Sequence, residues 1–170
     1  MLPKKSLSVL AALIFLCFLG VPPANAAPQC FTLESLEGSY ASIGHYGANV
    51  AIGIGTRQFD GAGNLTGTVL VNEPTPGSTT GERTIVTAVQ MGTYTVNCDG
   101  TGVFTRILTV KGVQTSQTDN FVITKAIVKH HHLLATAIVD AQTTPSAIVA
   151  GGIFLTRSFT RLPDGEDQDD

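Results

Sequence analysis

The chain has 170 residues, of which 43% are hydrophobic and 14% are charged, and its formal net charge is −3. This length favours a single domain with a core large enough to fold alone. The acidic balance excludes the strongly basic surfaces that bind nucleic acid or anionic membranes, because both partners require positive patches.

Residues 1–26 have the pattern of a signal peptide. Lysines precede the apolar run of residues 7–21, and the small residues Ala24 and Ala26 predict cleavage after Ala26. The run is shorter than the ~20 residues of a spanning helix, so no membrane anchor is expected after cleavage. The predicted location is therefore secreted or periplasmic.

Two cysteines remain beyond the cleavage site, and an exported protein usually meets an oxidising compartment. A disulfide bond between Cys30 and Cys98 is predicted, with two unpaired thiols as the alternative. The bridge would stabilise the fold by about 4 kcal/mol in the chain-entropy model. It would also hold residues 27–35, a lead before the first strand, across one mouth of the folded domain.

Runs of β-branched and aromatic residues recur through residues 36–162, separated by turns rich in Gly, Asn and Asp. The clearest is a hairpin at residues 90–111, whose turn ends on Gly100. The polar residues 113–119 are expected to connect two strands. The predicted strands span residues 36–43, 50–59, 65–72, 83–96 with a bend at Gly92, 103–110, 120–128, 132–141 and 147–162, of which the last is the longest.

About eight sequential strands without a long amphipathic helix predict an all-β fold. We expect a single antiparallel up-and-down β-barrel over residues 36–162, because closure removes the exposed sheet edges, and a β-sandwich is the alternative. Residues 163–170 are predicted to form a disordered acidic tail. The interior of an eight-stranded barrel is just wide enough to be filled by side chains or to hold one small ligand.

Small and apolar strand residues supply the candidate interior. They either fill a core or line an apolar cavity of the kind that binds a small hydrophobic ligand. The candidates are Ile52, Ile54, Val69, Val71, Ile107, Val149, Gly151, Ile153 and Leu155.

The most conspicuous polar cluster is the run from Lys129 to His132. On a strand, His130 and His132 share one face, and the apolar set Leu133, Ala135, Ala137 and Val139 is predicted to point inward. Two histidines need a third ligand to hold Zn²⁺ or Cu²⁺, and His45 is the only other histidine. A solvated turn is the favoured interpretation, and metal binding by His130 and His132 stays open.

No stretch of the chain predicts catalysis. The segments beginning at Asp60 and Asp99 are interpreted as hairpin turns, since neither has the alternating acidic ligands of a calcium loop. Nucleophile-elbow, triad and phosphate-loop patterns are missing from the sequence. We therefore identify no catalytic residue, cofactor or metal, and a non-enzymatic protein is favoured.

The segment Leu36-Glu37-Gly38-Ser39-Tyr40, with Arg157 or Arg161 near the end of the chain, resembles lipocalin-like (calycin) barrels. In that group an Arg or Lys covers a Gly-x-Trp on the first strand, and here Tyr40 stands in place of the Trp. The segments at residues 38–40, 59–67 and 92–102 are similar to uncharacterised bacterial secreted proteins. This resemblance implies a barrel and no particular activity.

Three functions follow as hypotheses. The first is a secreted, non-enzymatic, lipocalin-like barrel that binds a small apolar ligand. The second is a barrel enzyme resembling allene oxide cyclases, which requires polar side chains such as Tyr40, Tyr94, Arg106 or Arg157 to face a cavity. The third is a packed structural or surface-interaction domain, with a filled interior and an apolar patch outside. The oligomeric state is left open.

Overall fold

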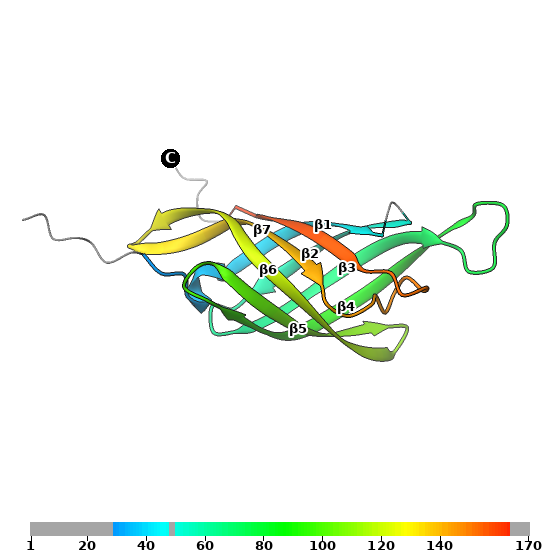
Figure 1. Ribbon diagram of the computed structural model, residues 1–170, viewed down its shortest axis with the longest axis horizontal. Coiled ribbons are helices and arrows are strands. Elements are labelled where there is room, and N and C mark those ends of the chain that lie inside the picture. Colours follow the sequence, from blue (N-terminus) through cyan, green and yellow to red (C-terminus); the bar gives the residue numbers. More distant parts are fainter. Residues whose placement is uncertain (1–28, 48–49, 164–170) are drawn as a thin grey trace, which may run out of the picture.

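The structure, a computed structural model, describes residues 29–47 and 50–163. The predicted signal peptide, residues 1–26, and the acidic tail from residue 164 onward lie outside these residues. Eight strands follow a short 3-10 helix (Figure 1). The helix η1 spans Leu33–Leu36, and the strands are β1 Gly38–Tyr46, β2 Ala51–Phe59, β3 Asn64–Pro74, β4 Arg83–Val96, β5 Thr101–Val110, β6 Val113–Lys129, β7 His132–Gln142 and β8 Leu155–Arg161.

Consecutive strands pair antiparallel, and β8 pairs with β1, so the sheet closes on itself. The predicted single up-and-down β-barrel is confirmed, and the β-sandwich alternative is wrong. The long strands β4 and β6 run obliquely along the molecule, and the hairpin of β6 and β7 projects at one end (Figure 1). Strand β4 continues through Gly92, as predicted.

The last strand differs from its prediction. It begins at Leu155 and is the shortest of the eight, because residues 147–154 form a loop. Gly151 and Gly152 have φ angles of 97° and 71°, which lie outside the strand region of backbone space. Two consecutive glycines adopt these angles without the steric cost that other residues meet, so they end the strand pattern.

Strands β6 and β7 also differ from their predictions. Residues 113–119 belong to β6 rather than to a connection. Within them Gln117 and Asp119 point into the barrel and find polar partners there. The pairing of β6 with β7 shifts register between Ile123 and Ala126. Beyond this irregularity the inward set of β7 is Ile138, Asp140 and Gln142, whereas Val139 of the predicted set points outward.

Both ends of the barrel are covered. At one end the predicted disulfide joins Cys30 to Cys98, with their Cα atoms 4.5 Å apart, and the Phe31 amide donates to the carbonyl of Cys98 at 3.2 Å. This anchors η1, whose Leu36 is fully buried in the barrel. At the opposite end Val149, from the loop before β8, is buried. The lead therefore covers one mouth, as predicted, and this loop covers the other.

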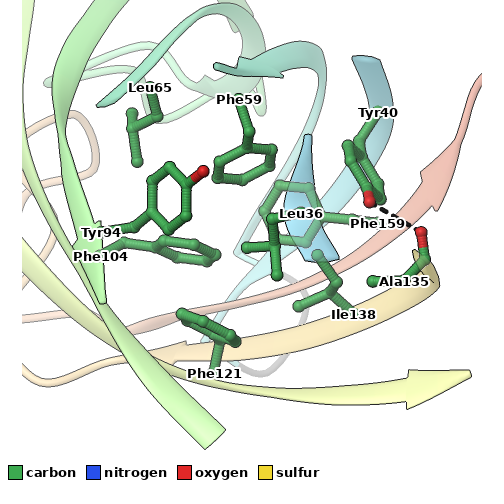
Figure 2. Close-up of a cluster of buried hydrophobic side chains, with 10 residues drawn as sticks. All are labelled: Leu36, Tyr40, Phe59, Leu65, Tyr94, Phe104, Phe121, Ala135, Ile138 and Phe159. Carbon is green, nitrogen blue, oxygen red and sulfur yellow. Dashed lines mark hydrogen bonds between the residues drawn. The ribbon is translucent and has the colours of Figure 1, made fainter. Parts of the chain in front are cut away.

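The interior is arranged in three layers along the barrel axis. Strand β8 shows them in order, since Leu155, Arg157 and Phe159 all point inward. The layer next to η1 is aromatic, and in it Phe104 stacks on Phe121 with ring centroids 4.2 Å apart (Figure 2). The layer at the opposite end is a smaller apolar cluster of Tyr46, Ala51, Val71, Val149 and Leu155. Charged and amide side chains occupy the middle.

Candidate functional site

The middle layer, which we call the polar layer, is built from inward positions on six strands. Each of these side chains points inward because side chains alternate between the two faces of a strand, so that every second residue faces the interior. Its members are Arg57 on β2, Gln90 on β4, Arg106 on β5, Gln117 and Asp119 on β6, Asp140 and Gln142 on β7, and Arg157 on β8.

Asp119 is held by two arginines. The Nε of Arg106 donates to its Oδ2 at 2.5 Å, and the Nη2 of Arg106 donates to its Oδ1 at 2.8 Å. The Nη2 of Arg157 lies 2.8 Å from the same Oδ1. Arg157 also holds Asp140, with Nη2 2.6 Å from its Oδ2. The two carboxylates are thus linked through one guanidinium, in the paired and hydrogen-bonded form that buried charges require.

Arg57 has a different environment. Its guanidinium carbon lies 4.8 Å from the ring centroid of Phe104 and 4.6 Å from that of Phe159, which is cation–π geometry. Its Nη2 donates to Gln90 at 3.1 Å, and its Nη1 is 3.8 Å from Asp140 Oδ2. Among the described residues, its Nε and Nη1 have no hydrogen-bond acceptor. Arg57 therefore joins the polar layer to the aromatic layer.

Burial and neighbouring charges shift the pKa values of these side chains in different directions. Burial, followed by repulsion from Arg157 and Arg106, lowers the pKa of Arg57 well below its usual value. Burial also acts to lower the pKa of Arg157, but attraction to Asp140 and Asp119 outweighs it and raises that pKa. Burial acts to raise the pKa of Asp119, whereas Arg157 and Arg106 outweigh it and lower that pKa. Arg157 and Asp119 therefore form a stable charged pair near neutral pH.

The space beside the polar layer is small. A cavity of about 10 Å³, measured for the centre of a water-sized sphere, lies among Tyr46, Gln90, Arg106, Gln117 and Arg157. This volume admits about one water molecule. The predicted polar residues Arg106 and Arg157 do point inward, but the carboxylates beside them are engaged by arginines. Arg157 and Asp140 also border a hollow of about 480 Å³, which lies on the outer wall among outward residues such as Val139.

The two predicted tyrosines lie in the aromatic layer, where their hydroxyls are engaged by the backbone. Tyr40 donates to the carbonyl of Ala135 at 2.7 Å (Figure 2), and Tyr94 donates to that of Leu33 at 3.0 Å. The guanidinium carbon of Arg161 lies 5.7 Å from the ring centroid of Tyr40, and its Nη1 donates to the carbonyl of Glu37. Arg161, rather than Arg157, thus contacts the tyrosine of the first strand.

The histidine run lies in the connection between β6 and β7. His130 and His131 have φ angles of 49° and 68° and form the turn, and His132 begins β7 with an exposed side chain. The Nδ1 of His132 is 3.9 Å from a carboxylate oxygen of Glu34. Within residues 29–47 and 50–163 no three His, Cys, Asp or Glu side chains gather as a metal site would require. His45 is on the outer face of β1, towards the opposite end of the barrel.

The segments at Asp60 and Asp99 are hairpin turns, as predicted. The Oδ1 of Asp60 accepts hydrogen bonds from the amides of Ala62 and Asn64, each at 2.8 Å. The Oδ1 of Asp99 accepts from the amide of Thr101 at 2.9 Å. Both carboxylates therefore organise their own turns.

The outer wall holds the second notable feature. Several residues predicted to be interior are exposed on it, since Ile52, Ile54 and Ile107 point outward, whereas Val71, Val149 and Leu155 are buried as predicted. Seven exposed side chains form a patch on four neighbouring strands, which we call the apolar face. It consists of Ile43 on β1, Ile52 and Ile54 on β2, Leu70 on β3, and Ile85, Val89 and Met91 on β4.

The sequence analysis missed the polar layer as a unit. In the sequence, the layer is indicated by a charged residue that has a large apolar residue two positions before it and another two positions after it. Examples are Phe104-x-Arg106-x-Leu108 and Leu155-x-Arg157-x-Phe159. A strand that alternates in this way points the charge in the same direction as its bulky neighbours. Recurrence of the pattern on two strands indicates charges that face one another inside a closed sheet.

Comparisons of the chain with protein-family models, curated proteins and solved structures return no match. In the described part of the chain, no helix has the length and apolarity needed to cross a membrane.

Proposed function

We propose that this protein is a non-enzymatic, extracytoplasmic barrel that acts through its outer surface, as a packed surface-interaction domain. The observation that carries the proposal is the patch of large apolar side chains that stand exposed on β1 to β4 of a barrel whose interior is filled by its own side chains. Exposed apolar patches of this kind mark interaction sites.

The interior supports this proposal over binding of a ligand inside the barrel. Pockets for small molecules have volumes of roughly 300–1,000 Å³, whereas the cavity beside the polar layer measures about 10 Å³. Leu36 and Val149 cover the two mouths, so a ligand would have to displace one of them. The disulfide ties the segment that carries Leu36 to the β4–β5 turn, which opposes its displacement.

The polar layer supports a structural role over catalysis. A catalytic carboxylate needs access to substrate, but Asp119 and Asp140 have fully buried side chains within contact of arginines. The ion pairs connect the neighbouring strands β5 and β6, and β7 and β8, and Arg157 of β8 also reaches Asp119 of β6. They therefore favour one strand register over alternatives, as buried polar groups do in some proteins. The barrel is then a rigid support for its outer wall.

Native mass spectrometry of protein isolated from the cells that export it tests the proposal. We expect masses that correspond to the disulfide-bonded chain alone, in whatever assembly it forms. Incubation with a panel of fatty acids and aromatic compounds should add no saturable, one-per-chain ligand. A co-purifying small molecule that is retained by a Leu70→Ser variant of the apolar face, but lost from a Val149→Asp variant at the barrel mouth, would contradict it.

A further inference from the structure

We propose that the apolar face binds a second copy of the same chain, so that two barrels associate side by side through β1 to β4. This inference rests on the proposed function, because it names the partner of the outer surface. It is carried by the continuity, size, charge and shape of that face.

The exposed side chains of the apolar face are continuous across strands. Ile43 lies directly opposite Ile54, and Ile54 directly opposite Leu70, so three large side chains form a row over β1, β2 and β3. Val89 pairs with Thr68, one outward position along β3 from Leu70, which extends the row diagonally onto β4. Directly and diagonally paired residues lie within side-chain contact. The seven residues therefore form one surface rather than scattered exposures.

The apolar face has the size of a protein interface. Its seven side chains are between 42% and 62% exposed. For side chains of this size the fractions correspond to roughly 700 Å², close to the ~800 Å² that each partner contributes to a standard protein interface. Monomeric proteins leave apolar patches of at most about 300–600 Å².

Charge favours an identical partner. Between the strand ends, the outward positions of β1 to β4 hold no Asp, Glu, Lys or Arg, and Arg83 lies at the first position of β4. A face without charge meets a copy of itself without like-charge repulsion, whereas a strongly charged partner gains nothing from it. A twofold dimer, which places the same patch on both sides, is also the commonest form of oligomer.

The face has both projections and hollows. One hollow of about 460 Å³ lies beside Gly55, and another of about 450 Å³ lies beside Gly67. Ile54 and Leu70 stand at the edge of the first, and Val89 and Met91 at the edge of the second. Projections next to hollows on one surface allow the side chains of one copy to enter the hollows of the other, as close packing of an interface requires.

The polar groups of the face favour protein over lipid as the partner. Thr56, Thr68 and Gln58 line the same hollows as the apolar residues. Hydrocarbon offers these hydroxyl and amide groups no hydrogen-bond partner, which makes their burial in a bilayer costly. A second protein chain can supply such partners, and typical protein interfaces mix apolar contact with hydrogen bonds.

Sedimentation equilibrium of the mature, disulfide-bonded protein over a dilution series tests the inference. We expect a dimer that dissociates at least tenfold more readily in an Ile54→Asp variant. The matched control is Ile127→Asp, because Ile127 is 51% exposed against 58% for Ile54 but lies on the projecting β6–β7 hairpin. Circular dichroism should show that both variants are folded, and Ile54→Thr replaces Ile54→Asp if the latter is not.

Three outcomes overturn the inference. The first is a wild-type protein that is monomeric at every concentration of the series, including millimolar. The second is an Ile127→Asp variant that dissociates as readily as Ile54→Asp. The third is an oligomer that neither substitution affects. Vesicles of phosphatidylcholine are added in a parallel arm. A monomer that binds them through Ile54 refutes the second copy as partner and leaves the proposed function standing, whereas a ligand retained inside the barrel refutes the proposed function itself.

Discussion

Replacement of Asp119 by asparagine tests whether the polar layer holds the barrel together. The substitution keeps the shape of the side chain and removes its charge, so Arg106 and Arg157 lose the carboxylate that lies within 2.8 Å of both. The side chain of Asp119 is fully buried, so bulk solvent cannot compensate for the loss of its charge. Breaking a buried ion pair from one side costs about 3–5 kcal/mol. That is a large share of the ~5–15 kcal/mol by which domains are stable.

Urea unfolding at pH 7, followed by far-UV circular dichroism, measures this loss. Glu34→Gln is the exposed control, because its pair with His132 is more than half exposed on both sides and should cost less than about 1 kcal/mol. The double variant Arg106→Met, Asp119→Leu removes both partners and should recover much of the loss. An Asp119→Asn variant within 1 kcal/mol of wild type would refute the reasoning.

Three further predictions concern the wall, the disulfide and pH. Gly92→Ala should destabilise the barrel by more than about 2 kcal/mol, because a Cβ at this position would lie 2.0 Å from a backbone carbonyl oxygen of β5. Gly53→Ala should be tolerated, since its Cβ would have no atom nearer than 3.4 Å. Thermal unfolding compares the two variants. Serine at both Cys30 and Cys98 should lower the free energy of unfolding by about 4 kcal/mol in urea. The mature wild type, cleaved after Ala26, should expose no titratable thiol when it is denatured without reduction. Burial raises the pKa of Tyr46 to about 12, above its usual 10.0, so its contribution to stability is complete below pH 10 and is lost as the pH rises towards 12; Tyr46→Phe should flatten alkaline unfolding curves over that window.

Local signals in the sequence were enough to predict the barrel. Turns at Asp60 and Asp99, and short connections between successive strands, specify which strands pair, because hairpins bring neighbours together. The disulfide was predicted from the two cysteines that remain beyond the cleavage site and from the oxidising compartment that an exported protein usually meets. The loop at residues 147–154 was missed because its β-branched residues outweighed the glycines that end the strand pattern.

It was harder to predict which side chains of a strand point into the barrel than to predict that the strand exists. Alternation divides a strand into two sets of side chains, but only the closed barrel decides which set is inside. The usual preference for apolar interiors assigned Ile54 and Ile107 to the core, whereas Arg57 and Arg106 occupy the inward positions of the same strands. Arg106 is stable inside because Asp119, on the neighbouring strand β6, pairs with it. Arg57 lies against the rings of Phe104 and Phe159, with Asp140 3.8 Å away. Such partnership is invisible within one strand.

The candidate site was accordingly predicted only in part. Arg106 and Arg157 were identified as polar residues that could point inward, and they do. Their engagement by carboxylates depends on contacts between strands, which the pattern of a single strand does not contain. The apolar face was foreseen only as a general property of a packed barrel, since Ile52 and Ile54 of β2 were assigned to the interior and its other five members were not singled out.

Electron density inside the barrel tests the central claim most directly, namely that the interior is filled and the outer wall carries the function. A crystal structure at about 1.5 Å resolution, from protein isolated from its exporting cells and soaked with a mixed panel of fatty acids and aromatic compounds, supplies this measurement. We predict density for the side chains of the polar layer and for about one water molecule in the 10 Å³ cavity beside Arg106 and Arg157. Continuous density for an organic ligand between those arginines and the aromatic layer would contradict the account.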